Sequence, residues 1–224
     1  MKKRLRELLD TGSIAEVTDL AGRQRRVLGL LVSLTFDADP LIAWRAVEAM
    51  GAAAARIADD APEYVREHLR RLRWLMSDES GGICWHAPEA MAEIIRHRPR
   101  LFSAHIPVVV YLLRVMEEED LVRFRPGILW AIGRLGEVAA SEVEAVLPAI
   151  AACLDDSDPQ VRGMAVWCLA QCRHTAPLET RSELLADEGT VVLYLEGHLL
   201  RRTVAELARQ AGGRSAGSHP CSPT

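Results

Sequence analysis

Side chains that could bind a partner recur at matching positions of successive helical segments. At intervals of 41, 41 and 37 residues these positions hold Glu48, Glu89, Trp130 and Trp167. Each lies in a stripe with spacings of three and four residues, which place side chains on one face of a helix. A tryptophan on such a stripe offers a large apolar area together with an N–H donor. The pattern predicts a partner-binding groove formed by Glu48, Glu89, Trp130, Arg134 and Trp167.

The positions of the two tryptophans can also be explained by packing between repeats, without a groove. Gly127, Gly133 and Gly163 lie close to them in the helical pattern, and each leaves space because it has no side chain. Trp130 and Trp167 would then fill the space between neighbouring repeats, as close packing of the interior requires. The sequence leaves both interpretations open.

A second set of residues could hold an anion near the start of helices. An aromatic residue precedes a basic one in Trp44-Arg45, Trp85-His86 and Phe124-Arg125. Pro88 and Pro126 suit the first turn of a helix, where free N–H groups and the helix dipole attract negative charge. A glycine pair would let the backbone approach a ligand closely. The predicted ligand site comprises Arg45, Gly81, Gly82, Trp85, His86 and Arg125.

This second set has a purely structural alternative as well. Trp44 and Trp85 would pack into the core. The basic residues that follow them would pair with Glu48 and Glu89, which lie three residues further along each helix. In that case no anion site forms.

Other kinds of site find little support. Cysteines and histidines occur near residue 84 and between Cys168 and His174, but no paired Cys-x-x-Cys motif brings four metal ligands together. No nucleophile with a supporting motif and no phosphate-binding Gly-rich loop is present. The net charge of −4, from 27 basic and 31 acidic residues, argues against nucleic-acid binding. We therefore expect no metal, no cofactor and no nucleic acid, and we favour a protein without catalytic activity.

The segments that position these residues are predicted to be helices. Asp39-Pro40 and Asp158-Pro159 are typical helix starts, with an aspartate as N-cap and a proline at the first helical position. Helical segments follow one another in pairs at a regular interval, which is typical of an α-solenoid. In such a fold the second helix of each pair lines the concave face.

Residues 155–170, with the sequence DDSDPQVRGMAVWCLA, resemble the second-helix half of a HEAT-like repeat. The shared features are an acidic turn with proline, a Val-Arg pair and small or aliphatic core positions. The resemblance covers about residues 25–175, and the whole chain is similar to small, uncharacterised bacterial HEAT-like proteins. It implies an all-α superhelix of about four HEAT-like helix pairs that binds proteins. Some related proteins act on tetrapyrrole-bearing proteins or use a metal for hydroxylation, but the His-Glu pairs of those hydroxylases are absent.

The pattern changes after about residue 177. Residues 190–195 are rich in β-branched and aromatic side chains, and Glu196-Gly197 suits a two-residue turn. Thr203 and Glu206 then form a capping-box motif. We predict a β-hairpin plus helix that caps the solenoid, and the alternative is one continuous helix over 190–210. The chain thus divides into N-terminal capping helices (1–24), the solenoid (25–176), the cap (177–211) and a disordered tail (212–224).

The sequence also favours a cytoplasmic location. The basic start has no apolar segment behind it, no apolar run approaches the ~18–20 residues of a membrane span, and five scattered cysteines suit reduced thiols. Two functions remain. The first is a non-catalytic adaptor whose concave groove binds a protein or peptide. The second is a small-molecule or cofactor-handling protein, enzyme or accessory factor, with an anionic ligand at residues 81–86. Neither the partner nor the oligomeric state follows from the sequence.

Overall fold

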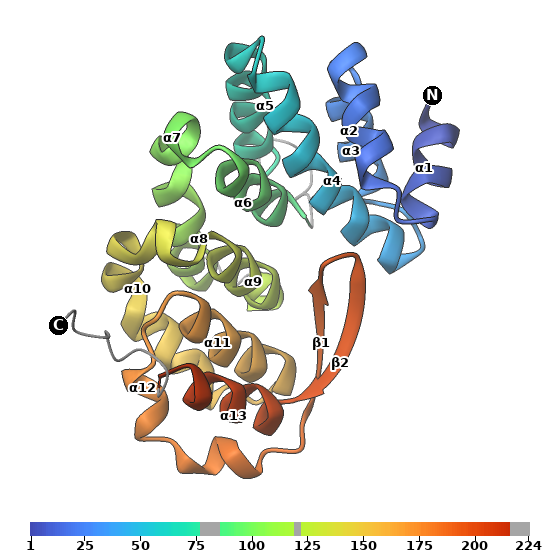
Figure 1. Ribbon diagram of the computed structural model, residues 1–224. Helices are drawn as coiled ribbons and strands as arrows, with labels where there is room; N and C mark the ends of the chain where they lie inside the picture. Colours follow the sequence, from blue (N-terminus) through green and yellow to red (C-terminus); the bar gives the residue numbers. More distant parts are fainter. Residues whose placement is uncertain (77–85, 119–121, 216–224) are drawn as a thin grey trace, which may run out of the picture.

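Two rows of helices build the body of the protein (Figure 1). The computed structural model describes residues 1–76, 86–118 and 122–215, and the inner helices of this part lie side by side in chain order. The inner row is α2 (Ile14–Arg23), α4 (Pro40–Ala58), α6 (Ala87–His97), α9 (Arg125–Leu135), α11 (Pro159–Gln171) and α13 (Val204–Ser215). The outer row is α3 (Val27–Leu34), α5 (Pro62–Trp74), α8 (Ile106–Glu118) and α10 (Ala140–Ala152). The predicted α-solenoid is confirmed.

Shorter elements complete the helical part. At the N-terminal end, α1 (Lys2–Asp10) packs on α2 and α4. The remaining short helices and turns are α7 (Pro99–Phe102), η2 (Ser103–His105), η3 (Val122–Phe124), η4 (Gly136–Ala139), η5 (Cys153–Asp155), α12 (Ala176–Glu179) and η6 (Ser182–Ala186). No helix in the described ranges is both long and apolar enough to cross a membrane.

The two Asp-Pro turns start inner helices as predicted. The carboxylate of Asp39 accepts a hydrogen bond from the N–H of Leu41 at 2.9 Å. The carboxylate of Asp158 accepts one from the N–H of Gln160, also at 2.9 Å. A proline follows each aspartate at the first helical position, where its missing N–H costs no hydrogen bond. These caps fix where α4 and α11 begin.

The predicted β-hairpin is confirmed. Strands β1 (Thr190–Leu195) and β2 (His198–Thr203) pair antiparallel, with Leu195 opposite His198. The turn residues Glu196 and Gly197 both have positive φ, 47° and 79°, as a type I′ turn requires. The alternative of one continuous helix is therefore wrong. The hairpin leads directly into α13.

The capping box at the start of α13 is also confirmed. The N–H of Thr203 donates to the carboxylate of Glu206 at 3.1 Å, and the N–H of Glu206 donates to the hydroxyl of Thr203 at 3.1 Å. This reciprocal pair satisfies donors that a helix start leaves free. It places the change from strand to helix at Val204.

Close packing on α11 holds the base of the hairpin. A Cβ on Gly163 would meet Cγ2 of the fully buried Val191 at 2.3 Å. We expect Gly163→Ala to lower the free energy of unfolding by about 1–3 kcal/mol, because the added methyl group overpacks this contact. Urea unfolding measures the change.

Gly212 of α13 provides a matched control. A Cβ at this position has no atom within 4 Å. Gly212→Ala should therefore raise the free energy of unfolding by up to about 1 kcal/mol, through helix propensity alone. Equal effects of the two substitutions would show that β1 does not pack closely on α11.

Candidate functional site

The hairpin stands edge-on against the concave face of the inner helices. Figure 1 shows β1 beside α9 and α11, and β2 on the side of the hairpin that faces away from them. The accessibilities agree, because Val191, Leu193 and Tyr194 of β1 are buried while every residue of β2 is exposed or half-buried. The concave face is therefore occupied by a segment of the chain itself.

Tyr194 connects the hairpin to α4 and α9. Its ring stacks on Trp44 of α4, with centroids 5.3 Å apart and planes inclined by 13°. Its hydroxyl donates to the carboxylate of Glu48, and its backbone carbonyl accepts from Nε1 of Trp130 at 2.9 Å. Burial, together with the hydrogen bond to Glu48, raises the pKa of Tyr194. The hydroxyl consequently stays protonated and remains a donor.

Arg45 fastens the tip of the hairpin. Its Nε donates to the carbonyl of Gly197 at 3.0 Å. Its Nη1 donates to the carbonyls of Leu9 and Asp10, at 2.9 and 2.6 Å, at the end of α1. The guanidinium thus joins the β-turn to the first helix and adds hydrogen bonds to carbonyl groups at the end of that helix.

A buried ionic contact links α6 to α9 beneath this region. Glu93 is 0% exposed, and its two carboxylate oxygens accept from Nε of Arg134 at 2.6 Å and from Nε of Arg96 at 2.9 Å. The guanidinium of Arg134 also lies 5.3 Å from the ring centroid of Trp130. A buried carboxylate with two guanidinium partners is compensated, whereas removing either partner would leave buried charge.

A histidine–carboxylate pair lies at the start of α6. Nδ1 of His86 is 3.3 Å from Oε1 of Glu89, which is only 2% exposed. Burial lowers the pKa of His86, but the hydrogen bond and charge of Glu89 outweigh it, so the pKa is raised. Oε1 also lies against Gly127 of α9, where a Cβ would come within 2.2 Å of it. Glycine at this position is what allows the carboxylate to pack between the helices.

The predicted groove is not an open surface. Trp130 is 1% exposed and Trp167 is 7% exposed, so the expectation of exposed tryptophans is wrong. For Trp167 the alternative is correct, because its ring fills the space beside Gly133, where a Cβ would lie 2.3 Å from Cζ3. The hairpin covers Glu48 and Trp130. Helical periodicity identified the inner face correctly but did not show that the hairpin lies against it.

The described part of the predicted anion site is engaged in internal contacts. Arg45 binds three carbonyl groups and does not pair with Glu48. His86 pairs with Glu89, as the structural alternative expected. Arg125 donates to the carboxylate of Asp156 at 2.8 Å. Gly81, Gly82 and Trp85 lie outside the described residues.

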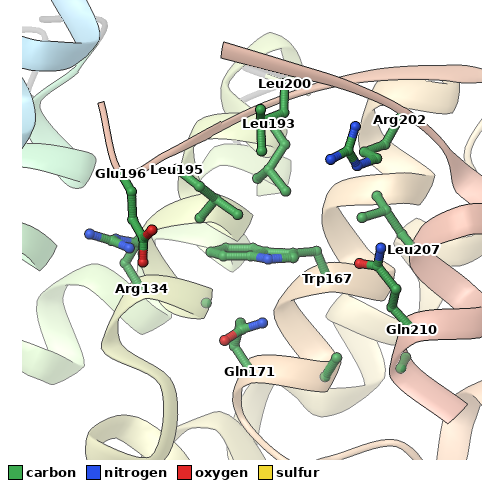
Figure 2. Close-up of a pocket in the computed structure, with 13 residues that line it drawn as sticks. Arg134, Trp167, Gln171, Leu193, Leu195, Glu196, Leu200, Arg202, Leu207 and Gln210 are labelled. Atoms are coloured by element: carbon green, nitrogen blue, oxygen red, sulfur yellow. The ribbon is translucent and has the colours of Figure 1, made fainter. Parts of the chain in front are cut away.

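A pocket of about 300 Å³ remains between the hairpin, α9, α11 and α13 (Figure 2). Figure 2 shows the indole of Trp167 lying across it below the leucines of the two strands, with Arg134 and Glu196 at one end. Its lining comprises Gly133, Arg134, Trp167, Ala170, Gln171, Leu193, Leu195, Glu196, Leu200, Arg202, Leu207, Gln210 and Ala211. The pocket combines apolar walls with polar ends, and two residues of the predicted groove, Arg134 and Trp167, line it.

The cysteines do not form a reactive or metal-binding group in the described ranges. Cys153, Cys168 and Cys172 are free and buried, and burial raises the pKa of the Cys168 thiol. A thiol with a raised pKa is a poor nucleophile. No cluster of three or more potential metal ligands occurs among the described residues.

Comparison with known families supports the repeat assignment. Residues 122–171, from η3 to the end of α11, match the family model of the HEAT-like repeat. The resemblance to HEAT-like repeats is confirmed. Trp130, Arg134 and Trp167 all lie in the matched HEAT-like segment. The chain therefore contains a helical repeat scaffold of a kind often used for protein interaction.

One curated relative is an uncharacterized protein of Archaeoglobus fulgidus. It is 32% identical over 108 residues, which make up 48% of this chain and 53% of the relative. The aligned region thus spans about half the length of that protein. This similarity carries no activity over to the chain.

Sequence reasoning missed two residues of the site, Tyr194 and Gln160. Tyr194 lies in the predicted hairpin, but nothing in the spacing indicates that it reaches Glu48, 146 residues away. Gln160 follows the Asp-Pro cap of α11, yet its side-chain amide binds both the N–H and the carbonyl of Val192. These contacts depend on the docking of the hairpin, which no local motif specifies.

The hydrogen bond between Tyr194 and Glu48 can be measured by a double-mutant cycle. Tyr194→Phe keeps the ring stack but removes the donor of a half-buried carboxylate, so it should lower the free energy of unfolding by about 1–3 kcal/mol. Combination with Glu48→Ala, which removes the acceptor, should show a coupling energy of about 0.5–3 kcal/mol in urea unfolding.

Tyr111→Phe on α8 is the control, because this tyrosine is 40% exposed. It should change the free energy of unfolding by less than about 0.5 kcal/mol. A coupling energy near zero between Tyr194 and Glu48 would contradict the docked position of the hairpin.

Proposed function

We propose that the protein is a non-catalytic scaffold that binds a protein or peptide partner. The proposed binding site is the pocket between the hairpin, α9, α11 and α13, which would receive an apolar side chain of the partner. The observation that carries this proposal is the position of Trp167 across a pocket on the concave side, below the leucines of the two strands and between polar ends. Tryptophan is enriched among the residues that contribute most to binding energy at protein interfaces.

The size and chemistry of the pocket suit one anchoring side chain. A volume of about 300 Å³ is at the lower end of the usual range for ligand sites. Burying ~100 Å² of apolar surface against Trp167 and the leucines would contribute about 2.5 kcal/mol to binding. The polar ends, with Arg134 and Gln171 on the helices, offer hydrogen-bonding groups to the backbone around the anchor.

The rigid surroundings of the pocket also favour binding without large rearrangement. Arg134 is held by Glu93 at 2.6 Å, and the ring of Trp167 is in close contact with Gly133. Side chains that are already fixed lose little conformational entropy when a partner binds. The alternative of an anionic small molecule near residue 86 has less support, because Arg45 and Arg125 are both engaged in internal contacts.

A substitution that fills the pocket tests the proposal. Gln210 lines the pocket but is exposed on α13, so Gln210→Trp can occupy the space without disturbing the core. Affinity capture from lysate of the source organism, quantified by mass spectrometry, should yield proteins that wild type retains and Gln210→Trp loses by at least tenfold, or about 1.4 kcal/mol.

Arg209→Trp is the matched control, since Arg209 is the neighbouring exposed residue and does not line the pocket. It should retain the same proteins as wild type. Thermal unfolding of all three proteins checks that each is folded. If Gln210→Trp retains every protein that wild type binds, the pocket is not the binding site.

A further inference from the structure

The two edges of the hairpin differ in how their backbone groups are satisfied. On the outer edge of β1, Nε2 of Gln160 donates to the carbonyl of Val192 at 2.9 Å, and the N–H of Val192 donates to Oε1 of Gln160 at 2.8 Å. The next outward carbonyl, that of Tyr194, accepts from Nε1 of Trp130 at 2.9 Å. Side chains of α11 and α9 thus take the place of a third strand along β1.

Along β2, no other element of the described ranges supplies such a closure. Tyr194 and Val192 are opposite Leu199 and Arg201, so the backbone groups of these two β2 residues point outward on the other side. Within the described residues, neither the N–H nor the carbonyl of Leu199 has a hydrogen-bond partner, and the N–H of Arg201 has none. The carbonyl of Arg201 accepts only from the guanidinium of Arg202, at 2.9 Å. A free strand edge therefore runs from Leu199 to Arg201.

The free edge is accessible and positively charged. Figure 1 shows β2 on the side of the hairpin away from α9 and α11, and Arg201 is exposed. The strand carries His198, Arg201 and Arg202 but no acidic residue. Neither arginine forms an ion pair with a described side chain. An unpaired edge is a template for another strand, and unpaired guanidinium groups favour carboxylates on that strand.

We propose that the free edge of β2 binds an extended acidic segment of a partner protein as a third strand. This inference rests on the proposed scaffold function and describes the chemistry of its partner. In an antiparallel arrangement, one partner residue would exchange both backbone hydrogen bonds with Leu199. The residues opposite Arg201 and Arg202 would be acidic, and those opposite Leu199 and Leu200 apolar.

The strand and the pocket then form one continuous surface. Leu200 and Arg202 of β2 both line the pocket, so a partner residue opposite Leu200 would lie on the same face of the hairpin. A second copy of this chain is a poorer occupant. Pairing β2 with another β2 would bring four arginines together without any acid, and like charges on adjacent strands repel.

A synthetic peptide tests the proposal. The probe is a short peptide with the central sequence Asp-Glu-Val-Leu, which is the order expected for antiparallel pairing with residues 199–202. It is titrated to about 1 mM, so that weak binding is also detected. Hydrogen exchange of individual amides is followed by NMR. In the free protein, the amides of Leu199 and Arg201 should exchange faster than those of Leu200 and Arg202, which face β1. On binding, exchange at Leu199 and Arg201 should slow at least tenfold.

Modified peptides separate strand pairing from general electrostatic attraction. N-methylation of the peptide leucine removes the donor to Leu199 and should abolish binding. N-methylation of the valine should have little effect, because its N–H points away from β2. A Lys-Lys-Val-Leu peptide should not bind. The double substitution Arg201→Glu plus Arg202→Glu should weaken binding of the acidic peptide at least tenfold, and Arg209→Glu should leave it unchanged.

Several results would overturn the proposal. It fails if the acidic peptide does not bind at about 1 mM, if the acidic and basic peptides bind equally, or if exchange at Leu199 and Arg201 does not change. Protection of these amides by self-association in sedimentation experiments would assign the edge to a second copy instead. If the acidic peptide does not bind while Gln210→Trp still abolishes partner capture, only the strand proposal is wrong. If the peptide does not bind and Gln210→Trp also retains every protein that wild type binds, the proposed scaffold function is wrong as well.

Discussion

The contact of Tyr194 with α4 and α9 holds the concave face closed. In a solenoid, each repeat touches only its neighbours, so stability and shape are set locally. Tyr194 departs from this rule, since its ring and hydroxyl bind α4 while its carbonyl accepts from α9. These hydrogen bonds join residues 146 and 64 positions apart in sequence. The hairpin therefore adds a contact between α4 and α9, whose side chains Trp44 and Trp130 also meet edge to face with ring centroids 4.7 Å apart.

The inner face contains buried carboxylates, and each of them needs a positively charged or hydrogen-bonding partner. An inner stripe that includes Glu89 and Glu93 would be well hydrated on an open groove. In the structure these carboxylates are almost fully buried, with that of Glu89 between α6 and α9, and a buried charge without a partner is strongly destabilising. Arg134 of the next repeat supplies the compensation for Glu93 at 2.6 Å. Such pairs add little net stability compared with apolar packing, but they specify which helix faces which.

Local patterns in the sequence were sufficient to predict the elements but not how they dock. The Asp39 and Asp158 caps, the Glu196-Gly197 turn and the Thr203–Glu206 capping box depend on residues close in sequence, and all are present in the structure. The stripe containing Trp130 was correctly placed on the inner face. Its burial was one of two interpretations that the sequence left open, because helical periodicity shows which face of a helix turns inward but not what covers that face. The contact that covers it depends on Tyr194, a residue of a different element with no matching signal.

The hairpin changes the kind of recognition that the scaffold supports. An open solenoid groove contacts its partner through many side chains along its inner helices. Here the same helices bind the chain's own hairpin, and the proposed binding surface is the pocket beside Trp167 together with the edge of β2. A strand edge binds any extended backbone, so the affinity from its hydrogen bonds carries little sequence information. Discrimination must then come from the side chains beside the edge. In the proposed complex, the arginines of β2 and the pocket next to Leu200 would provide that discrimination, because they would favour acidic over basic segments and an apolar residue at one fixed position.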